Sequence, residues 1–209
     1  MVATLKATTI DRVKEQGLGS IDINDEQYDA ILQGLIDETS IQFEVFLGHR
    51  LLKAARTEVH DVERFRHSFF LREYPLASVA TVKFRTSIAT DWSTVAALPA
   101  TSYTFDSATG RLYVDRDVID AKDGLQVVYT GGFSTTTTLL TQEYPEIASA
   151  ADRQVAYAFK RRNNPAASST SVGASSVGYP VAFGEPGQGA LSLLKSVRDT
   201  LGAYKRRVL

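Results

Sequence analysis

A run of short β-type segments between Arg56 and Phe133, with helical patterns before and after it, constrains the fold of this chain most strongly. Apolar side chains two residues apart lie on one face of a strand. That spacing occurs at Tyr103 and Phe105, at Leu112 and Val114, and at Leu125, Val127 and Tyr129. The polar link 106–110 ends in glycine and predicts a hairpin loop. We therefore expect about six strands here, in a small, largely antiparallel sheet folded on itself.

Helical patterns lead into this block. A short helix is expected over 8–16, closed by Gly17. A longer one follows, in which Asn24 and Gln27 fit a capping box and Gly48 fits a glycine stop. Its apolar residues recur at three- and four-residue steps: Tyr28, Ile31, Leu32, Leu35, Ile36, Thr39, Phe43, Phe46 and Leu47. This broad face predicts a core helix, and its width also permits one edge to meet a neighbouring subunit.

Helix returns after the β block. Gly131 and Gly132 predict a turn that leaves the sheet, and no helix is expected to open on the threonine tract 135–138. Pro145 suits a first helical position. The ridge behind it repeats every four residues, at Ile147, Ala151, Val155 and Phe159, and three cations, Lys160, Arg161 and Arg162, close the helix.

The last part of the chain changes composition. Residues 163–190 are rich in Ser, Gly and Ala with a single charge, which predicts a flexible segment. Residues 191–209 then predict a cationic helical arm with a narrow apolar seam. One interpretation is that the arm docks onto an acidic, grooved partner through Leu194, Val197, Leu201, Tyr204, Lys205, Arg206 and Arg207. The other is a helix folded back on its own bundle.

Composition bounds the function. The chain has 209 residues, is 44% hydrophobic and carries a formal net charge of -1, so it can bury a real core and has no global attraction to nucleic acid or an anionic membrane. Without cysteine it has no disulfide and no thiolate chemistry. Residues 1–16 do not form a signal peptide, and no stretch approaches the roughly 18 apolar residues of a membrane span. We expect a soluble protein retained where it is made.

No motif predicts catalysis, a cofactor or a metal. The aspartates Asp115, Asp117, Asp120 and Asp123 lack the central glycine and the closing glutamate of a calcium loop. The three histidines show no short metal spacing, and the nucleophile elbow, the P-loop and the dinucleotide fingerprint are missing. Aromatic residues such as Tyr103, Phe105, Tyr113 and Tyr129 are expected in the core rather than in a base-stacking groove, because no lysine or arginine groove accompanies them.

Taken in order, several short stretches resemble the head–tail connector adaptors of tailed bacteriophages and gene transfer agents. They are Leu47-Gly48-His49-Arg50, Thr57-Glu58, Tyr74-Pro75-Leu76-Ala77-Ser78-Val79, the Trp92 loop, Tyr103 with Gly110-Arg111-Leu112, and Val127-Val128-Tyr129-Thr130-Gly131-Gly132-Phe133. The resemblance implies an α+β subunit. Its parts would be a helical bundle over 1–162 with a β insertion at about 56–133, a flexible segment over 163–190 and a C-terminal helical arm over 191–209.

The same resemblance implies a structural role without catalysis. Such subunits assemble as a dodecameric ring in the virion neck, made in the cytoplasm of the host bacterium. The ring joins the portal protein to the tail-side stopper or tail terminator and lets DNA pass through its lumen. The alternative is an enzyme or small-ligand-binding domain whose site is built from scattered residues.

Overall fold

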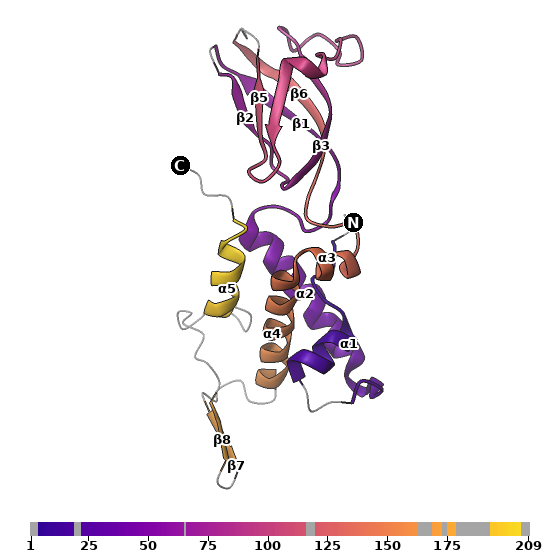
Figure 1. The fold of residues 1–209 in the computed structure, drawn as a ribbon, viewed down its shortest axis with the longest axis vertical. Coiled ribbons are helices and arrows are strands. Elements are labelled where there is room, and N and C mark those ends of the chain that lie inside the picture. Colours follow the sequence, from indigo (N-terminus) through magenta and orange to yellow (C-terminus); the bar gives the residue numbers. More distant parts are fainter. Residues whose placement is uncertain are drawn as a thin grey trace. The chain divides into compact units, whose positions relative to one another are not determined.

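The computed structural model describes residues 4–18, 22–64, 66–115, 120–162, 169–172, 175–178 and 193–205. The chain divides into two compact units, each drawn in Figure 1: a helical unit, Met1–Gly48 with Thr136–Leu209, and a β unit, His49–Thr135. The fold is therefore α+β, as the sequence predicts. No helix in the described ranges is both long and apolar enough to cross a membrane.

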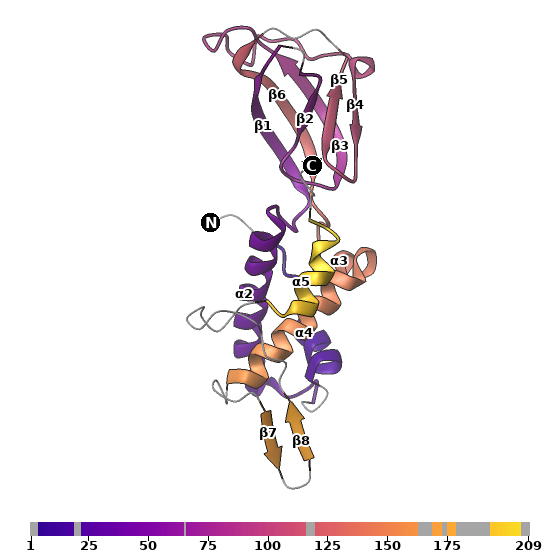
Figure 2. The ribbon, with the colours of Figure 1, turned by 90° about the vertical axis from the view of Figure 1, so that its left-hand side faces the viewer.

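The helical unit is built around one central helix. Its elements are α1 (Ile10–Arg12), the π-helical turn η1 (Val13–Leu18), the 3₁₀ turn η2 (Glu26–Tyr28), α2 (Asp29–Leu47), α3 (Thr137–Glu143), α4 (Pro145–Arg162) and α5 (Lys195–Gly202). Helix α4 contacts η1, α2, α3 and α5, and Figures 1 and 2 show α2, α4 and α5 side by side. Part of the apolar core joins η1, α2 and α4 through Val13, Leu18, Leu32, Ile36, Val155 and Ala156.

The ends of these helices test the predicted signals. Gly48 ends α2 in the left-handed conformation, with φ 78°, so the glycine stop is confirmed. The predicted cap at its start is wrong by one residue, because the Asp25 carboxylate accepts the Gln27 N–H at 3.0 Å and opens η2. Gly17 does not end the first helix. It lies inside η1, where an added Cβ would approach the Ala156 side chain and the Asp152 carbonyl to 3.0 Å.

The threonine tract contains the start of a helix that its sequence did not predict. The Thr136 side chain accepts the Leu139 N–H and caps α3, so the prediction of no helix there is wrong. Helix α4 then begins at Pro145, as predicted, and its last turn holds the three cations. Side-chain capping at Thr136 was a readable signal, since threonine is a preferred cap residue.

In its described residues the β unit has six strands: β1 (Ala54–Val62), β2 (Ser68–Phe70), β3 (Leu76–Phe84), β4 (Tyr103–Asp106), β5 (Arg111–Val114) and β6 (Ala121–Gly131), with a 3₁₀ turn η3 (Ala100–Ser102) before β4. They form two antiparallel three-stranded sheets, ordered β1-β6-β3 and β2-β5-β4. The predicted hairpin is confirmed, since β4 pairs with β5 from Tyr103↔Val114 to Asp106↔Arg111.

One apolar core lies between the two sheets. It is formed by Val62, Phe69, Leu71, Leu76, Val82, Leu112, Val114, Leu125, Val127 and Tyr129. Gly131, the last residue of β6, and Gly132 directly after it both lie where a side chain has no room. A Cβ at Gly131 would collide with the Glu73 carbonyl, and Gly132 has φ 116° and lies against the Leu52 carbonyl.

A separate two-stranded hairpin occurs in the segment predicted to be flexible. Strand β7 (Ser169–Val172) pairs antiparallel with β8 (Ser175–Gly178), from Ser169↔Gly178 to Val172↔Ser175. These residues therefore form regular secondary structure, which the composition of the segment did not indicate. The rest of 163–190 lies outside the described residues, as do residues 191–192 and 206–209 of the predicted arm.

Candidate functional site

Helix α2 exposes apolar side chains on the face opposite its buried one. Its buried side chains are Leu32, Ile36, Thr39, Ser40, Phe43 and Leu47. At 100° per residue, Ala30, Gly34, Ile41 and Val45 share the other side of the helix, and all four are exposed. The side chains of Ile41 and Val45 are 53% and 76% exposed. We call these four residues the outer stripe of α2.

Acidic residues border the outer stripe. Asp37 and Glu38 lie on either side of it, both exposed. Asp37 is paired with Lys6 at 2.8 Å and accepts a hydrogen bond from Gln33, whereas Glu38 forms no ion pair or hydrogen bond with a side chain in the described part of the chain. From residue 15 to residue 49 the sequence has eight acidic residues and no lysine or arginine. The outer stripe is thus an apolar strip on a negatively charged helix.

Helix α5 packs on its own unit. Val197 and Leu201 are fully buried, Leu194 nearly so, and α5 contacts α4 and α2. The Leu194 N–H donates to the buried Gln154 side chain at 3.0 Å. Of the two interpretations of this helix, folding back on the bundle is therefore the one observed. The three leucine and valine side chains are already covered within the chain and do not form an open docking seam.

The residues after α5 complete this contact. The Tyr204 hydroxyl donates to Glu146 at 3.1 Å, and its ring meets the edge of Tyr144 with centroids 6.0 Å apart. Burial, followed by the hydrogen bond to Glu146, raises the pKa of Tyr204 to about 12. Lys205 is exposed and lies over the Phe46 ring at 4.9 Å. The predicted partner-binding residues Arg206 and Arg207 lie outside the described residues.

The exposed side of α5 is cationic along one edge. Lys195, Arg198, Gly202 and Lys205 follow one another at three- and four-residue steps, and we call them the cationic flank of α5. Lys195 pairs with Asp199 on the same helix at 2.7 Å, with both side chains largely exposed. Gly202 adds no bulk between the cations, and a Cβ there would meet nothing within 4 Å.

Buried polar contacts tie the N-terminal segment to α4. Asp152 is 2% exposed, accepts a hydrogen bond from Thr8 and pairs with Arg12 at 2.9 Å. Burial raises the pKa of Asp152, and the bonds from Thr8 and Arg12 oppose that rise. Lys14 is also buried, and its ammonium group is satisfied by Asp29 and by two backbone carbonyls. All of these charges have partners, so the cluster is structural.

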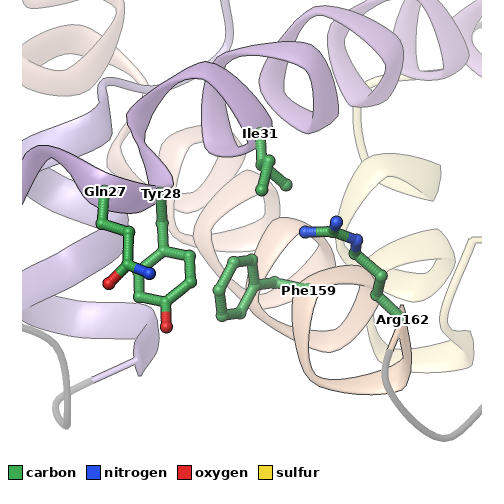
Figure 3. A pocket seen from close by; sticks show the side chains of 5 residues that line it. All are labelled: Gln27, Tyr28, Ile31, Phe159 and Arg162. Atoms are coloured by element: carbon green, nitrogen blue, oxygen red, sulfur yellow. The ribbon is translucent and has the colours of Figure 1, made fainter.

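A shallow pocket lies between the start of α2 and the end of α4 (Figure 3). Its volume is about 320 Å³, and its lining residues are Gln27, Tyr28, Ile31, Phe159 and Arg162. The rings of Tyr28 and Phe159 meet edge to face, with centroids 5.4 Å apart. One amide and one guanidinium face this apolar floor, and none of the lining residues carries a carboxylate or an imidazole. The lining therefore offers contact surface but no general acid–base pair.

The β unit holds a hydrogen-bonded polar group beside its core. The buried Tyr129 hydroxyl donates to Glu58 and accepts the Glu73 N–H at 3.0 Å. Burial raises the pKa of Glu58, but hydrogen bonds from His60, Tyr129 and the Arg72 backbone outweigh it, so this pKa lies below its ordinary value of 4.5. Burial and the bond to Glu58 raise the pKa of Tyr129. Glu58 is therefore held as a carboxylate that orders the strands around it.

An aromatic and cationic patch faces outward from the β2-β5-β4 sheet. Arg111 lies between two rings, 5.4 Å from the Phe70 centroid and 4.6 Å from the Tyr113 centroid. Phe70 and Tyr113 are 46% and 38% exposed. The prediction that Tyr113 belongs to the core is therefore wrong. Strand alternation places Leu112 inward and turns its neighbours Arg111 and Tyr113 outward.

The aspartates of the β unit serve the backbone. Asp120 accepts the Arg64 N–H, and the Asp123 N–H donates to Asp61 at 2.7 Å. Asp117 lies outside the described residues. Across the described ranges, no group of three or more His, Cys, Asp or Glu side chains is arranged to hold a metal ion.

Two exposed surfaces, the outer stripe of α2 and the aromatic and cationic patch of the β2-β5-β4 sheet, were not predicted from the sequence. Ile41 and Val45 lie outside the apolar face predicted for α2. Their four-residue spacing in the sequence nevertheless places them together on the polar side of the helix. Phe70, Arg111 and Tyr113 come from two strands, so only the β2–β5 pairing brings them together. Conversely, the predicted partner-binding seam of α5 is part of the unit's own core.

Comparisons with known proteins give a fold but no sequence family. No protein-family model matches the chain, and no curated protein matches its sequence. Three similar solved structures come from gene transfer agent (GTA) particles, each 16% identical to this chain. A chain from the neck of an empty GTA particle with C6 symmetry has a TM-score of 0.59 and covers 97% of this chain and 92% of its own length.

The other two structures agree. A chain from the virion of a native GTA particle has a TM-score of 0.60, covering 100% of this chain and 95% of its own length. A chain from the neck of a native GTA particle with C12 symmetry has a TM-score of 0.53, covering 99% of this chain and 98% of its own length. At this identity the likeness establishes a shared fold over nearly the whole length of both chains.

Proposed function

We propose that this chain is a structural subunit of the neck of a phage-like particle, where copies form a ring that joins the portal to the tail-side stopper. The observation that carries the proposal is the shared fold with GTA neck chains, which extends over both units and nearly every residue. A likeness limited to one of the two units would support the proposal less, because a single fold hosts many functions.

The surface chemistry supports an assembly role. The outer stripe of α2 leaves Val45 76% exposed, and the β unit presents Phe70, Arg111 and Tyr113 together. Aromatic residues and arginine are enriched at protein interfaces, and exposed apolar patches mark contact sites. Each unit thus carries one surface suited to a protein partner. A ring subunit needs contacts with its neighbours and with the rings above and below it.

In this role the chain performs no catalysis, and its partners are macromolecules. The ring's lumen lets DNA pass without sequence recognition. The cations Lys205, Arg206 and Arg207 remain proposed contacts with acidic groups on the portal, whereas Leu194, Val197 and Leu201 hold α5 on its own bundle. Contacts made by exposed cations weaken with salt, because the Debye length is only about 10 Å at 0.1 M.

The test is electron microscopy of the purified chain mixed with the portal protein of the same particle. We expect a ring of additional density on one end of the portal, and co-sedimentation of the two proteins that raised salt weakens. A chain that neither binds the portal nor forms a ring in its presence would contradict the neck proposal. An unrelated portal of similar size serves as the specificity control.

A further inference from the structure

Among the described residues of the helical unit, none packs over the outer stripe of α2. Its residues lie opposite the side that packs on α4, and Ile41 and Val45 are 53% and 76% exposed. A Cβ added at Gly34 would meet nothing within 4 Å, so the helix backbone itself is accessible there. A second helix could approach closely at this point, because glycine adds no side-chain bulk.

The same unit carries a surface of the opposite charge. The cationic flank of α5 presents Lys195, Arg198 and Lys205 around the open position of Gly202. Arg198 forms no side-chain ion pair in the described part of the chain, and Glu38 beside the outer stripe forms none either. One helix of the unit is thus negative and apolar, and another is positive with a small central residue.

We propose that the outer stripe of α2 in one copy packs against Lys195, Arg198 and Gly202 of the cationic flank of α5 in the next copy, head to tail. This inference rests on the proposed neck ring and names its subunit contact. The aliphatic stems of Lys195 and Arg198 would cover Ile41 and Val45, while their charged ends reach Glu38 and Asp37. The apolar contact supplies most of the stabilisation, and the charges select the partner face.

Charge also argues against the symmetric alternative. Pairing two outer stripes face to face brings the Asp37 and Glu38 pairs of both copies together, and like charges across an interface are unfavourable. A contact between two different faces leaves one free face at each end of a dimer. Repetition of such a contact closes into a ring when the rotation between copies permits it. The contact therefore gives a ring, or an open filament where the rotation does not close, rather than a closed dimer.

Two single-face variants test this directly. Val45→Glu disables the outer stripe and leaves the flank, whereas Arg198→Glu disables the flank and leaves the outer stripe. Sedimentation velocity at rising concentration should show self-association of the native chain, weakened about tenfold or more in each variant. The controls are Ile88→Glu, another apolar residue that is 60% exposed, and Lys122→Glu, an exposed cation of the β unit. Both should associate like the native chain.

Mixing the two variants gives the decisive result. A head-to-tail contact predicts dimers but nothing larger, because one intact face remains on each partner. Adding Glu38→Lys to Arg198→Glu should restore association by reversing both charges. Overturning results are a native chain that stays monomeric, an Arg198→Glu chain that still associates fully, or a mixture without dimers. Any of these leaves the neck proposal standing if the chain still forms a ring on the portal by another face.

Discussion

Replacing Leu201 with alanine should destabilise the helical unit and leave the β unit unaffected. Leu201 is fully buried in α5 against its own bundle. Truncating a fully buried leucine removes its apolar contacts and leaves a cavity, which costs about 3 kcal/mol in the free energy of unfolding. With a urea dependence of about 2 kcal/mol per molar, the unfolding midpoint should fall by about 1.5 M.

Two optical signals separate the units in this experiment. The only tryptophan, Trp92, lies in the β unit, so its fluorescence follows that unit alone. Far-ultraviolet circular dichroism at the helix band follows the helical unit. We expect Leu201→Ala to shift the dichroism transition while the fluorescence transition keeps its midpoint.

The matched control is Arg198→Ala, an exposed position on the same helix, which should change the unfolding free energy by less than about 0.5 kcal/mol. Equal midpoints for Leu201→Ala and Arg198→Ala would refute the packing of α5 on its own bundle. In that case the seam of α5 would be free for a partner.

Three further predictions follow from buried contacts and from glycines. Tyr129→Phe should destabilise the β unit by about 1–3 kcal/mol, since Glu58 loses a buried hydrogen bond. Because the pKa of Glu58 is lowered in the folded state, its ionisation stabilises the β unit above the unfolded pKa, and this stabilisation is lost as pH falls through the folded pKa. In Tyr129→Phe the stability of the β unit, followed by Trp92 fluorescence, should therefore decrease less on acidification than in the native chain. An unchanged pH profile would contradict the role of this hydrogen bond. Asp152→Ala should cost the helical unit about 3 kcal/mol, because Arg12 loses its buried partner, and urea unfolding followed by dichroism checks it. Gly34→Ala should raise the stability of the helical unit by about 0.5–1 kcal/mol, because alanine favours a helix and has room at this exposed position. Gly132→Ala should lower the stability of the β unit, because Gly132 has a positive φ and lies against the Leu52 carbonyl. Thermal unfolding measures both changes, and changes of the same sign would contradict the backbone geometry described at these two glycines.

Sequence alone determined those elements whose signals are local. Gly48 ends α2 because only a residue tolerant of the left-handed conformation fits there, and Pro145 opens α4 because its fixed φ suits a first helical position. The polar link 106–110 and the two-residue alternation of apolar residues likewise predicted the β4–β5 hairpin. Each of these signals lies within a few residues of the feature that it predicts.

Only the tertiary structure decided which surfaces are covered. The apolar seam of α5 reads the same whether it faces its own bundle or a partner, and the contacts with α4 and Gln154 settle its place in this chain. Phe70 and Arg111 are adjacent only because β2 pairs with β5, so no local pattern could join them. The outer stripe of α2 is exposed because α4 packs on the opposite face of that helix. Periodicity reports which residues share a face, but the packing of distant segments decides which face meets water.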